Sequence, residues 1–163
     1  MLNVMEQEKL LRELENGFAA EKERLGFSVT LDELDEMFFV RDSVLDAGFV
    51  SKNLSRQLAR RVVETYMSWN EYLNGLMMPN PHHLLQATEH KLVDDETKKD
   101  AMKLMSKAMV LVSRNTNVGL TKDEKEEGKW FDEVVPFWKE TYLPVLENVM
   151  GQVVEGWKEQ AGK

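Results

Sequence analysis

The sequence lacks cysteine and isoleucine altogether, and its 163 residues include only four prolines. Without cysteine there can be no disulfide, no thiolate nucleophile and no cysteine-ligated zinc or iron–sulfur site. No apolar run approaches the ~18 residues that a membrane span requires. The stretch 1–16 carries charges throughout and has no apolar core of the kind found in secretory signals. We therefore expect a cytoplasmic protein that does not enter the membrane.

The charge balance is acidic, with 21 basic residues against 29 acidic ones and a formal net charge of −8. A field of that sign repels phosphate backbones and anionic membranes, so nucleic acid is not an expected partner of the chain as a whole. Hydrophobic residues make up 42% and charged residues 31%, as in ordinary globular proteins. At about 150 residues per domain, we expect one domain over 1–163.

Helical periodicity dominates the sequence. Apolar residues recur every seven positions from Val4 to Leu25, and Thr30 with Glu33 forms a capping box at the start of the next helix. No segment alternates apolar and polar residues between turn signals, so no sheet is expected. The pattern predicts an all-α antiparallel bundle of six to seven helices. They are expected over 2–25, between Thr30 and Gly48, between Ser51 and Pro79, over 81–92, from Asp94 to a linker at 114–121, after a second capping box at Thr121 and Glu124, and from Pro144 onward.

Three histidines, His82, His83 and His90, lie within nine residues. Histidine is the commonest metal ligand and a frequent acid–base catalyst, so this segment suggests a metal-dependent enzyme, with Glu89 as a further ligand. On a helix over 81–92, however, His83 and His90 would stand about 10.5 Å apart along the axis. Ligand atoms on one zinc ion lie only about 3–4 Å apart. We therefore expect that the protein binds no metal and no other cofactor. A metal-dependent helical enzyme that uses the segment His82–His90 is an alternative.

A second candidate is the segment 44–61, which resembles a helix-turn-helix with a glycine at the turn. Its basic residues Lys52, Arg56 and Arg60 repeat every four positions, and Arg61 lies beside them. Such a row is suited to contacts with phosphates. Any two helices joined at a glycine share this pattern, and the second helix is long for a recognition helix. Nucleic-acid binding through these four residues is therefore an alternative.

Surplus apolar residues give the leading hypothesis. Phe38, Phe39 and Val40 are consecutive, and Met102 and Met109 lie off the main apolar stripe of their helix. A helix that is apolar on more than one side must bury the second side in its own fold or against another subunit. Catalytic sequence signatures are missing. We therefore expect a non-enzymatic interaction or binding module that forms a homo-oligomer through its apolar helix faces. The same faces are expected to be able to bind another protein.

Overall fold

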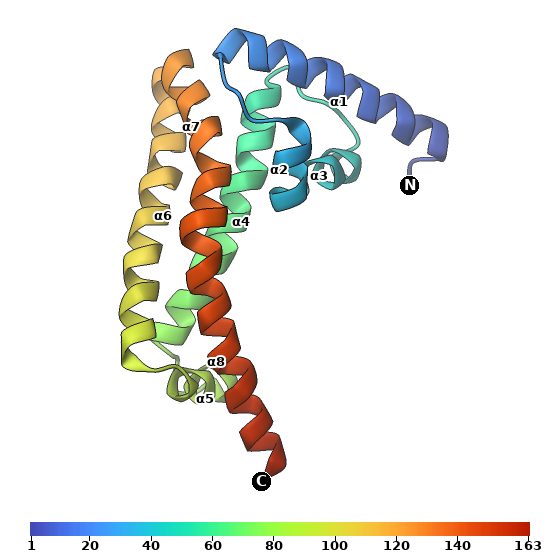
Figure 1. The fold of residues 1–163 in the computed structure, drawn as a ribbon. Coiled ribbons are helices and arrows are strands. Elements are labelled where there is room, and N and C mark those ends of the chain that lie inside the picture. Colours follow the sequence, from blue (N-terminus) through green and yellow to red (C-terminus); the bar gives the residue numbers. More distant parts are fainter. The chain divides into compact units, whose positions relative to one another are not determined.

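The computed structural model describes residues 1–163 and consists of helices and connecting turns without any strand (Figure 1). The predicted all-α fold without a sheet is confirmed. If the uninterrupted stretch from α7 to α8 counts as one helix, the chain has seven, within the predicted six to seven. The elements are α1 (Val4–Leu25), α2 (Leu31–Phe38), α3 (Val40–Ala47), α4 (Leu54–Met77), α5 (Leu84–Leu92), α6 (Asp95–Thr121), α7 (Glu124–Phe137), the π-helical η1 (Trp138–Tyr142) and α8 (Leu143–Gly162).

The chain forms two compact units. Unit 1 consists of Met1–Thr65 and Leu111–Pro136, and unit 2 consists of Tyr66–Val110 and Phe137–Lys163. Each unit is therefore built from two segments that are distant in the sequence. Each unit contains only part of α4 and only part of α6. The division therefore does not decide between one domain and two, and the expectation of a single domain stays a prediction. None of the helices combines the length and the apolar composition needed to cross a membrane.

The core of unit 1 joins α1, α2 and α3 to parts of α4, α6 and α7. Aromatic rings link its segments, because Phe27 lies 5.5 Å from Phe18 and 5.0 Å from Phe131 between ring centroids. The turn after α1 is tied to α7 by Asp132, whose Oδ1 accepts the backbone N–H groups of Ser28 and Val29 at 2.8 and 2.9 Å. The residues preceding α2 are thus fixed both by apolar packing and by the two hydrogen bonds to Asp132.

Caps define the first two helices. The Thr30 hydroxyl accepts the N–H of Glu33 at 3.1 Å, and the Glu33 carboxylate accepts the N–H of Thr30, which confirms the predicted capping box. Asn3 and Glu6 form a second box of the same kind at the start of α1. Gly26 ends α1 in the left-handed region at φ 72°, where glycine has no steric penalty.

The single helix expected between Thr30 and Gly48 is wrong, because Phe39 divides it into α2 and α3. Phe39 adopts φ 54°, ψ 45° and serves as the C-cap of one helix and the N-cap of the next. Its neighbours Phe38 and Val40 are fully buried, whereas 55% of Phe39 is exposed. The break turns the apolar faces of both helices inward, at the cost of a strained phenylalanine.

Two boundaries around α6 and α7 also differ from the prediction. The segment 114–121 was expected to be a linker, yet α6 continues through it to Thr121. Thr121 is therefore the end of a helix, and the expected capping box with Glu124 is wrong. Asp123 caps α7 instead, since its carboxylate accepts the N–H of Glu126 at 3.1 Å. The sequence contains the same four-residue pattern twice, two positions apart, and only the second instance caps a helix.

The core of unit 2 is built around aromatic residues. Tyr66 lies 5.6 Å from Trp138 and 5.3 Å from Tyr142, and the rings of Trp138 and Tyr142 stack at 5.2 Å with an interplanar angle of 11°. The hydroxyl of Tyr142 donates to Asn70 Oδ1 at 2.8 Å. Within the same unit, α5 packs on α8, where Gly156 faces the side chain of Leu92.

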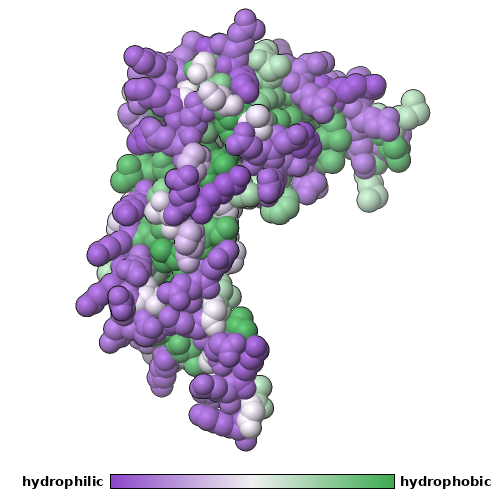
Figure 2. Space-filling view, in the orientation of Figure 1, coloured by the Kyte–Doolittle hydropathy of each residue, from purple (hydrophilic) through white to green (hydrophobic).

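Both prolines of the last helical stretch are accommodated without ending it. Pro136 lies inside α7, and Pro144 is the second residue of α8, close to the predicted first position. Between them η1 is π-helical, and the N–H of Leu143 donates to the carbonyl of Trp138, five residues back. Hydrophilic residues cover most of the face seen in Figure 2, with hydrophobic residues in smaller patches.

Candidate functional site

The four basic residues predicted to form one stripe lie in different environments. Lys52 and Arg60 are exposed, the first in the turn before α4 and the second on α4. Arg56 and Arg61 are partly buried: the Nε of Arg61 donates to the carbonyl of Phe38 at 2.8 Å, and Arg56 faces α6. Two of the four cations are therefore engaged inside unit 1 rather than offered to phosphates.

The helix-turn-helix-like segment has the expected glycine turn, but Ser51, Lys52 and Asn53, which were expected to start its second helix, lie in the turn before α4. Gly48 ends α3 in the left-handed region at φ 80°, and α4 begins six residues later at Leu54. The helix that follows is 24 residues long. With Arg56 and Arg61 directed at other parts of unit 1, only Lys52 and Arg60 remain free to contact a phosphate backbone, and nucleic-acid binding stays a prediction.

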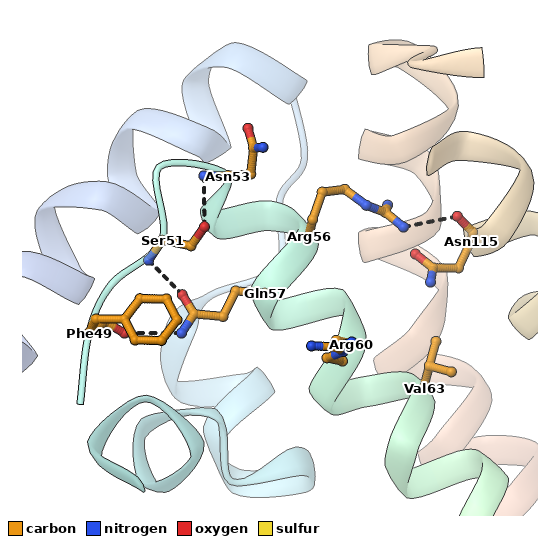
Figure 3. A pocket seen from close by; sticks show the side chains of 8 residues that line it. All are labelled: Phe49, Ser51, Asn53, Arg56, Gln57, Arg60, Val63 and Asn115. Carbon is orange, nitrogen blue, oxygen red and sulfur yellow. Dashed lines mark hydrogen bonds between the residues drawn. The ribbon is translucent and has the colours of Figure 1, made fainter. Parts of the chain in front are cut away.

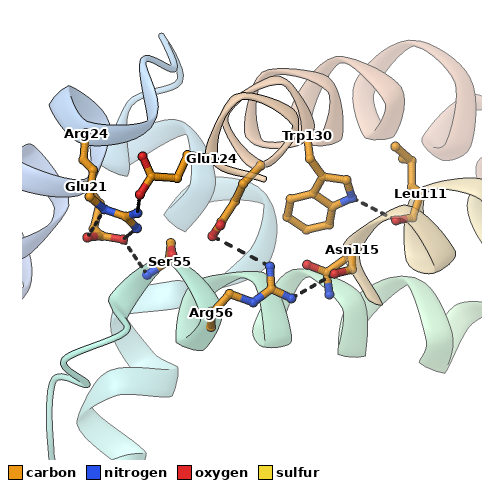
Figure 4. Close-up of polar contacts among 9 residues, drawn as sticks. Glu21, Arg24, Ser55, Arg56, Leu111, Asn115, Glu124 and Trp130 are labelled. Atoms are coloured by element: carbon orange, nitrogen blue, oxygen red, sulfur yellow. Dashed lines mark hydrogen bonds and ion pairs between the residues drawn. The ribbon is translucent and has the colours of Figure 1, made fainter. Parts of the chain in front are cut away.

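Arg56 lies at the centre of a buried polar cluster in unit 1 (Figure 4). Its Nη2 donates to the carbonyl of Asn115 at 3.0 Å, and its Nη1 lies 3.7 Å from Oε1 of Glu127. Glu127 is only 6% exposed. Three buried atoms of this cluster have no hydrogen-bond partner: Arg56 Nη1, Asn115 Oδ1 and Glu127 Oε1. The cluster thus retains one donor and two acceptors of unused hydrogen-bonding capacity.

A second ion cluster joins α1, α4 and α7 beside it (Figure 4). Arg24 donates to both carboxylate oxygens of Glu21, at 3.2 and 2.8 Å, and to Glu124 at 2.8 Å. Ser55, near the start of α4, donates its N–H to Glu21 at 3.2 Å. Burial acts to raise the pKa of Glu21, but the hydrogen bonds from Arg24 and Ser55 outweigh it and hold that pKa below its usual range. The charged side chains of this cluster are thus paired with one another.

A cavity of about 570 Å³ opens on one side of Arg56 (Figure 3). Two arginines line it and no carboxylate does, so its formal charge is positive in a chain whose net charge is −8. Arg60 takes part in none of the salt bridges of the structure. The lining residues are Phe49, Ser51, Asn53, Arg56, Gln57, Arg60, Val63 and Asn115.

The loop that lines one side of this cavity is held by Gln57. The side-chain amide of Gln57 donates to the carbonyl of Phe49 at 3.0 Å and accepts the N–H of Ser51 at 2.8 Å. Ser51 in turn accepts the N–H of Asn53 at 3.0 Å through its hydroxyl. Figure 3 shows these bonds linking the loop to the first turns of α4. The side chain of Gln57 therefore fixes the backbone of the loop that carries Phe49.

The histidine segment has a different geometry from the one expected. The helix predicted over 81–92 begins only at Leu84, so its predicted start is wrong, and His82 and His83 precede α5. His83 is the N-cap, with Nδ1 accepting the N–H of Gln86 at 3.2 Å. His90 Nδ1 lies 2.7 Å from the carbonyl of Leu76 and donates to it. Two of the three imidazoles thus have structural roles at this end of unit 2.

Glu89, the fourth member of the metal alternative, is also engaged. Its carboxylate accepts the hydroxyl of Tyr72 at 2.9 Å, and burial together with this bond raises the pKa of Tyr72 above its usual value. No group of three or more His, Asp or Glu side chains in the structure is arranged to share a metal ion. The metal alternative therefore has no supporting geometry on His82, His83, Glu89 and His90.

Sequence reasoning missed the residues that shape the cavity. Arg56 and Arg60 were singled out for their charge, but Phe49, Gln57 and Asn115 were not. The i, i+4 spacing of Arg56 and Arg60 carried the available signal, whereas Asn115 joins them only because α6 continues through the expected linker. No family model matches the chain, and no curated protein and no solved structure is similar to it.

Proposed function

We propose that this protein is a non-enzymatic binding module that holds a small anion in the Arg56–Arg60 cavity of unit 1. The observation that carries the proposal is a cavity of about 570 Å³ with two arginines and no carboxylate in its lining. Ligand-binding clefts of globular proteins span roughly 300–1,000 Å³. A guanidinium keeps its charge at all physiological pH values and matches carboxylate and phosphate oxygens with paired N–H donors.

Arg60 is the principal ligand-binding group in this proposal. It is exposed and engaged in no ion pair, whereas the charge of Arg56 is shared with Glu127 at 3.7 Å. Binding an anion at Arg60 therefore breaks no existing interaction. The lining also lacks histidine, aspartate and glutamate, the side chains that most often move protons in catalysis, which supports binding rather than turnover.

Titration of the intact protein with inorganic phosphate, pyrophosphate and citrate tests the proposal. We expect at least one of these anions to raise the melting temperature and to bind less tightly as salt is added, since a partly exposed charge pair is screened. Arg60→Gln should weaken that binding at least tenfold. Lys52→Gln removes an exposed cation outside the lining and should leave it unchanged. Equal binding by Arg60→Gln and the parent, or no binding of any of the three anions, would contradict the proposal.

A second candidate function, self-association, rests on the exposed face of α6 in unit 2. Met102, Met109 and Val110 are 57%, 39% and 58% exposed, although such side chains are usually buried. Phe38 and Val40, which also suggested self-association, are buried within unit 1 and cannot contribute. The partner proposed is a second copy of this chain, because two copies of this apolar face can cover each other about a two-fold axis.

Light scattering tests this second proposal. We expect a symmetric dimer that buries more than about 1,200 Å² in total. Met102→Glu combined with Met109→Glu should convert it to a monomer, while Val154→Glu, at an exposed site on α8, should not. A parent protein that is monomeric at high micromolar concentration would contradict self-association and leave the anion proposal untouched.

A further inference from the structure

Phe49 is an aromatic side chain at the cavity that contributes little to the core of unit 1. It lines the cavity and is 57% exposed. Burying a phenylalanine side chain stabilises a protein, so an exposed ring leaves much of that stabilisation unused. A ligand that covers the ring would gain that stabilisation.

The backbone beneath the ring is already ordered. The carbonyl of Phe49 and the N–H of Ser51 are both bonded to the amide of Gln57, and Ser51 supports Asn53. Ordering a loop on binding costs free energy, and a loop that is held in advance avoids much of that cost. Figure 3 shows Phe49 at one end of the cavity and Asn115 at the other, with Arg60 between them.

Asn115 lines the same cavity but offers it no accessible acceptor. It is 9% exposed, and its Oδ1, which has no hydrogen-bond partner, is itself buried. The cavity therefore combines an aromatic face and a free cation.

We infer that the ligand of this cavity is a small anion that carries a planar aromatic ring, with the ring stacked on Phe49 and its anionic group bound to Arg60. This inference rests on the anion-binding function proposed above and names the class of ligand. Aromatic side chains prefer offset-stacked or edge-to-face arrangements with other rings. The cavity of about 570 Å³ is of the size that takes such a molecule rather than a single phosphate ion.

Two pairs of probes separate the ring from the anion. Adenosine monophosphate is compared with ribose 5-phosphate, and indole-3-acetate with acetate, by calorimetric titration of the full chain. We expect the ring-bearing member of at least one pair to bind at least tenfold more tightly than its ring-free partner. The pair that shows this difference identifies the anionic group as a phosphate or a carboxylate.

Phe49→Leu should abolish that preference by lowering only the affinity of the ring-bearing probe. The matched control is Phe39→Leu, which alters another exposed phenylalanine outside the cavity and should leave all affinities unchanged. Equal affinities within both pairs, or a preference that survives Phe49→Leu, would overturn the inference while ring-free anions still bind at Arg60. If no anion binds the parent at all, the proposed function fails and the inference fails with it.

Discussion

The two units of the molecule treat buried polar groups in opposite ways. In unit 2, Tyr142 donates to Asn70, and Asn70 donates to the carbonyl of Met105 at 3.4 Å. In unit 1, the cluster of Arg56, Asn115 and Glu127 leaves three buried atoms without a hydrogen-bond partner, although Arg56 Nη1 and Glu127 Oε1 lie 3.7 Å apart as an ion pair. Buried groups are normally paired, and the exceptions in native structures call for an explanation. The contrast indicates that unit 2 is built for packing, while unit 1 keeps polar capacity beside a cavity.

The tyrosines of unit 2 support that view. Burial raises the pKa of Tyr66 and that of Tyr142 above the usual tyrosine value, so both hydroxyls are protonated at neutral pH and Tyr142 is a hydrogen-bond donor there. The pocket beside Tyr72 and Glu89 in the same unit measures about 60 Å³, against about 570 Å³ for the cavity of unit 1. Unit 2 offers little space for a ligand there.

The largest expected effect compares one glycine of each unit. A Cβ at Gly128 would lie 2.1 Å from the backbone oxygen of Leu25, whereas a Cβ at Gly156 would meet the side chain of Leu92 at 2.6 Å. A backbone cannot move aside as a side chain can. We expect Gly128→Ala to destabilise the protein by about 3 kcal/mol or more and Gly156→Ala by about 1 kcal/mol. Urea unfolding measures both, and equal losses would refute this contrast between the units.

The next effect tests the paired network of unit 2. Tyr142→Phe removes the donor to Asn70 Oδ1 and leaves that acceptor buried, so we expect a loss of about 1–3 kcal/mol in the free energy of unfolding. Tyr72→Phe, which removes a donor to the more exposed Glu89, is the matched control and should cost less. If Tyr142→Phe lowers the free energy of unfolding by less than the control does, the hydrogen bond to Asn70 contributes little to stability.

Helix caps provide a smaller comparison. Thr30 makes a reciprocal capping box in unit 1, while His83 makes one capping bond to α5, a helix of unit 2 without any buried residue. We expect Thr30→Ala to cost about 1 kcal/mol and His83→Ala less. Thermal unfolding of the two variants side by side checks the order, and the reverse order would mean that α5 matters more to stability than its exposure indicates.

The last prediction concerns the polar cluster itself, where the double replacement is expected to have the smallest effect of all. Because Arg56 and Glu127 are 3.7 Å apart and poorly hydrogen-bonded, replacing both by methionine should change stability by less than about 1 kcal/mol. Arg56→Met alone should cost roughly 3–5 kcal/mol, since it leaves the Glu127 carboxylate buried without its counter-charge. A double variant as unstable as the single one would indicate that the pair itself stabilises unit 1.

The sequence predicted the fold well because apolar periodicity and capping patterns are local signals. The heptad spacing of α1 and the Thr30–Glu33 box depend on residues a few positions apart, and both are present in the structure. The errors occurred where a tertiary contact outweighed a local signal. Phe39 divides a helix because Phe38 and Val40 are drawn into the core on either side of it.

The site was less accessible to sequence reasoning. The repeat of Arg56 and Arg60 indicated a basic surface. Only the fold shows that the two arginines differ, because Arg56 contacts Asn115 and Glu127. Arg60 is exposed. Asn115 was assigned to a linker, and its contact with Arg56 spans 59 positions. Gln57 has no sequence signature at all, because the backbone that it holds precedes its own helix.

The π-helical turn η1 has an evolutionary consequence. A π turn accommodates one more residue per hydrogen-bonded ring than an α turn, so η1 behaves like a one-residue insertion in an otherwise regular helix. Removing one residue between 138 and 142 would restore α geometry and leave the positions beyond it in nearly the same rotational setting. Leu146, Val149 and Val153, all buried, would then stay in the core, whereas a deletion in a regular α-helical turn before them would rotate them by about 100°. Descendants of this sequence should accordingly accept a single-residue deletion in η1 more readily than one in the neighbouring α-helical turns, and a length-changing mutational scan would reveal that asymmetry.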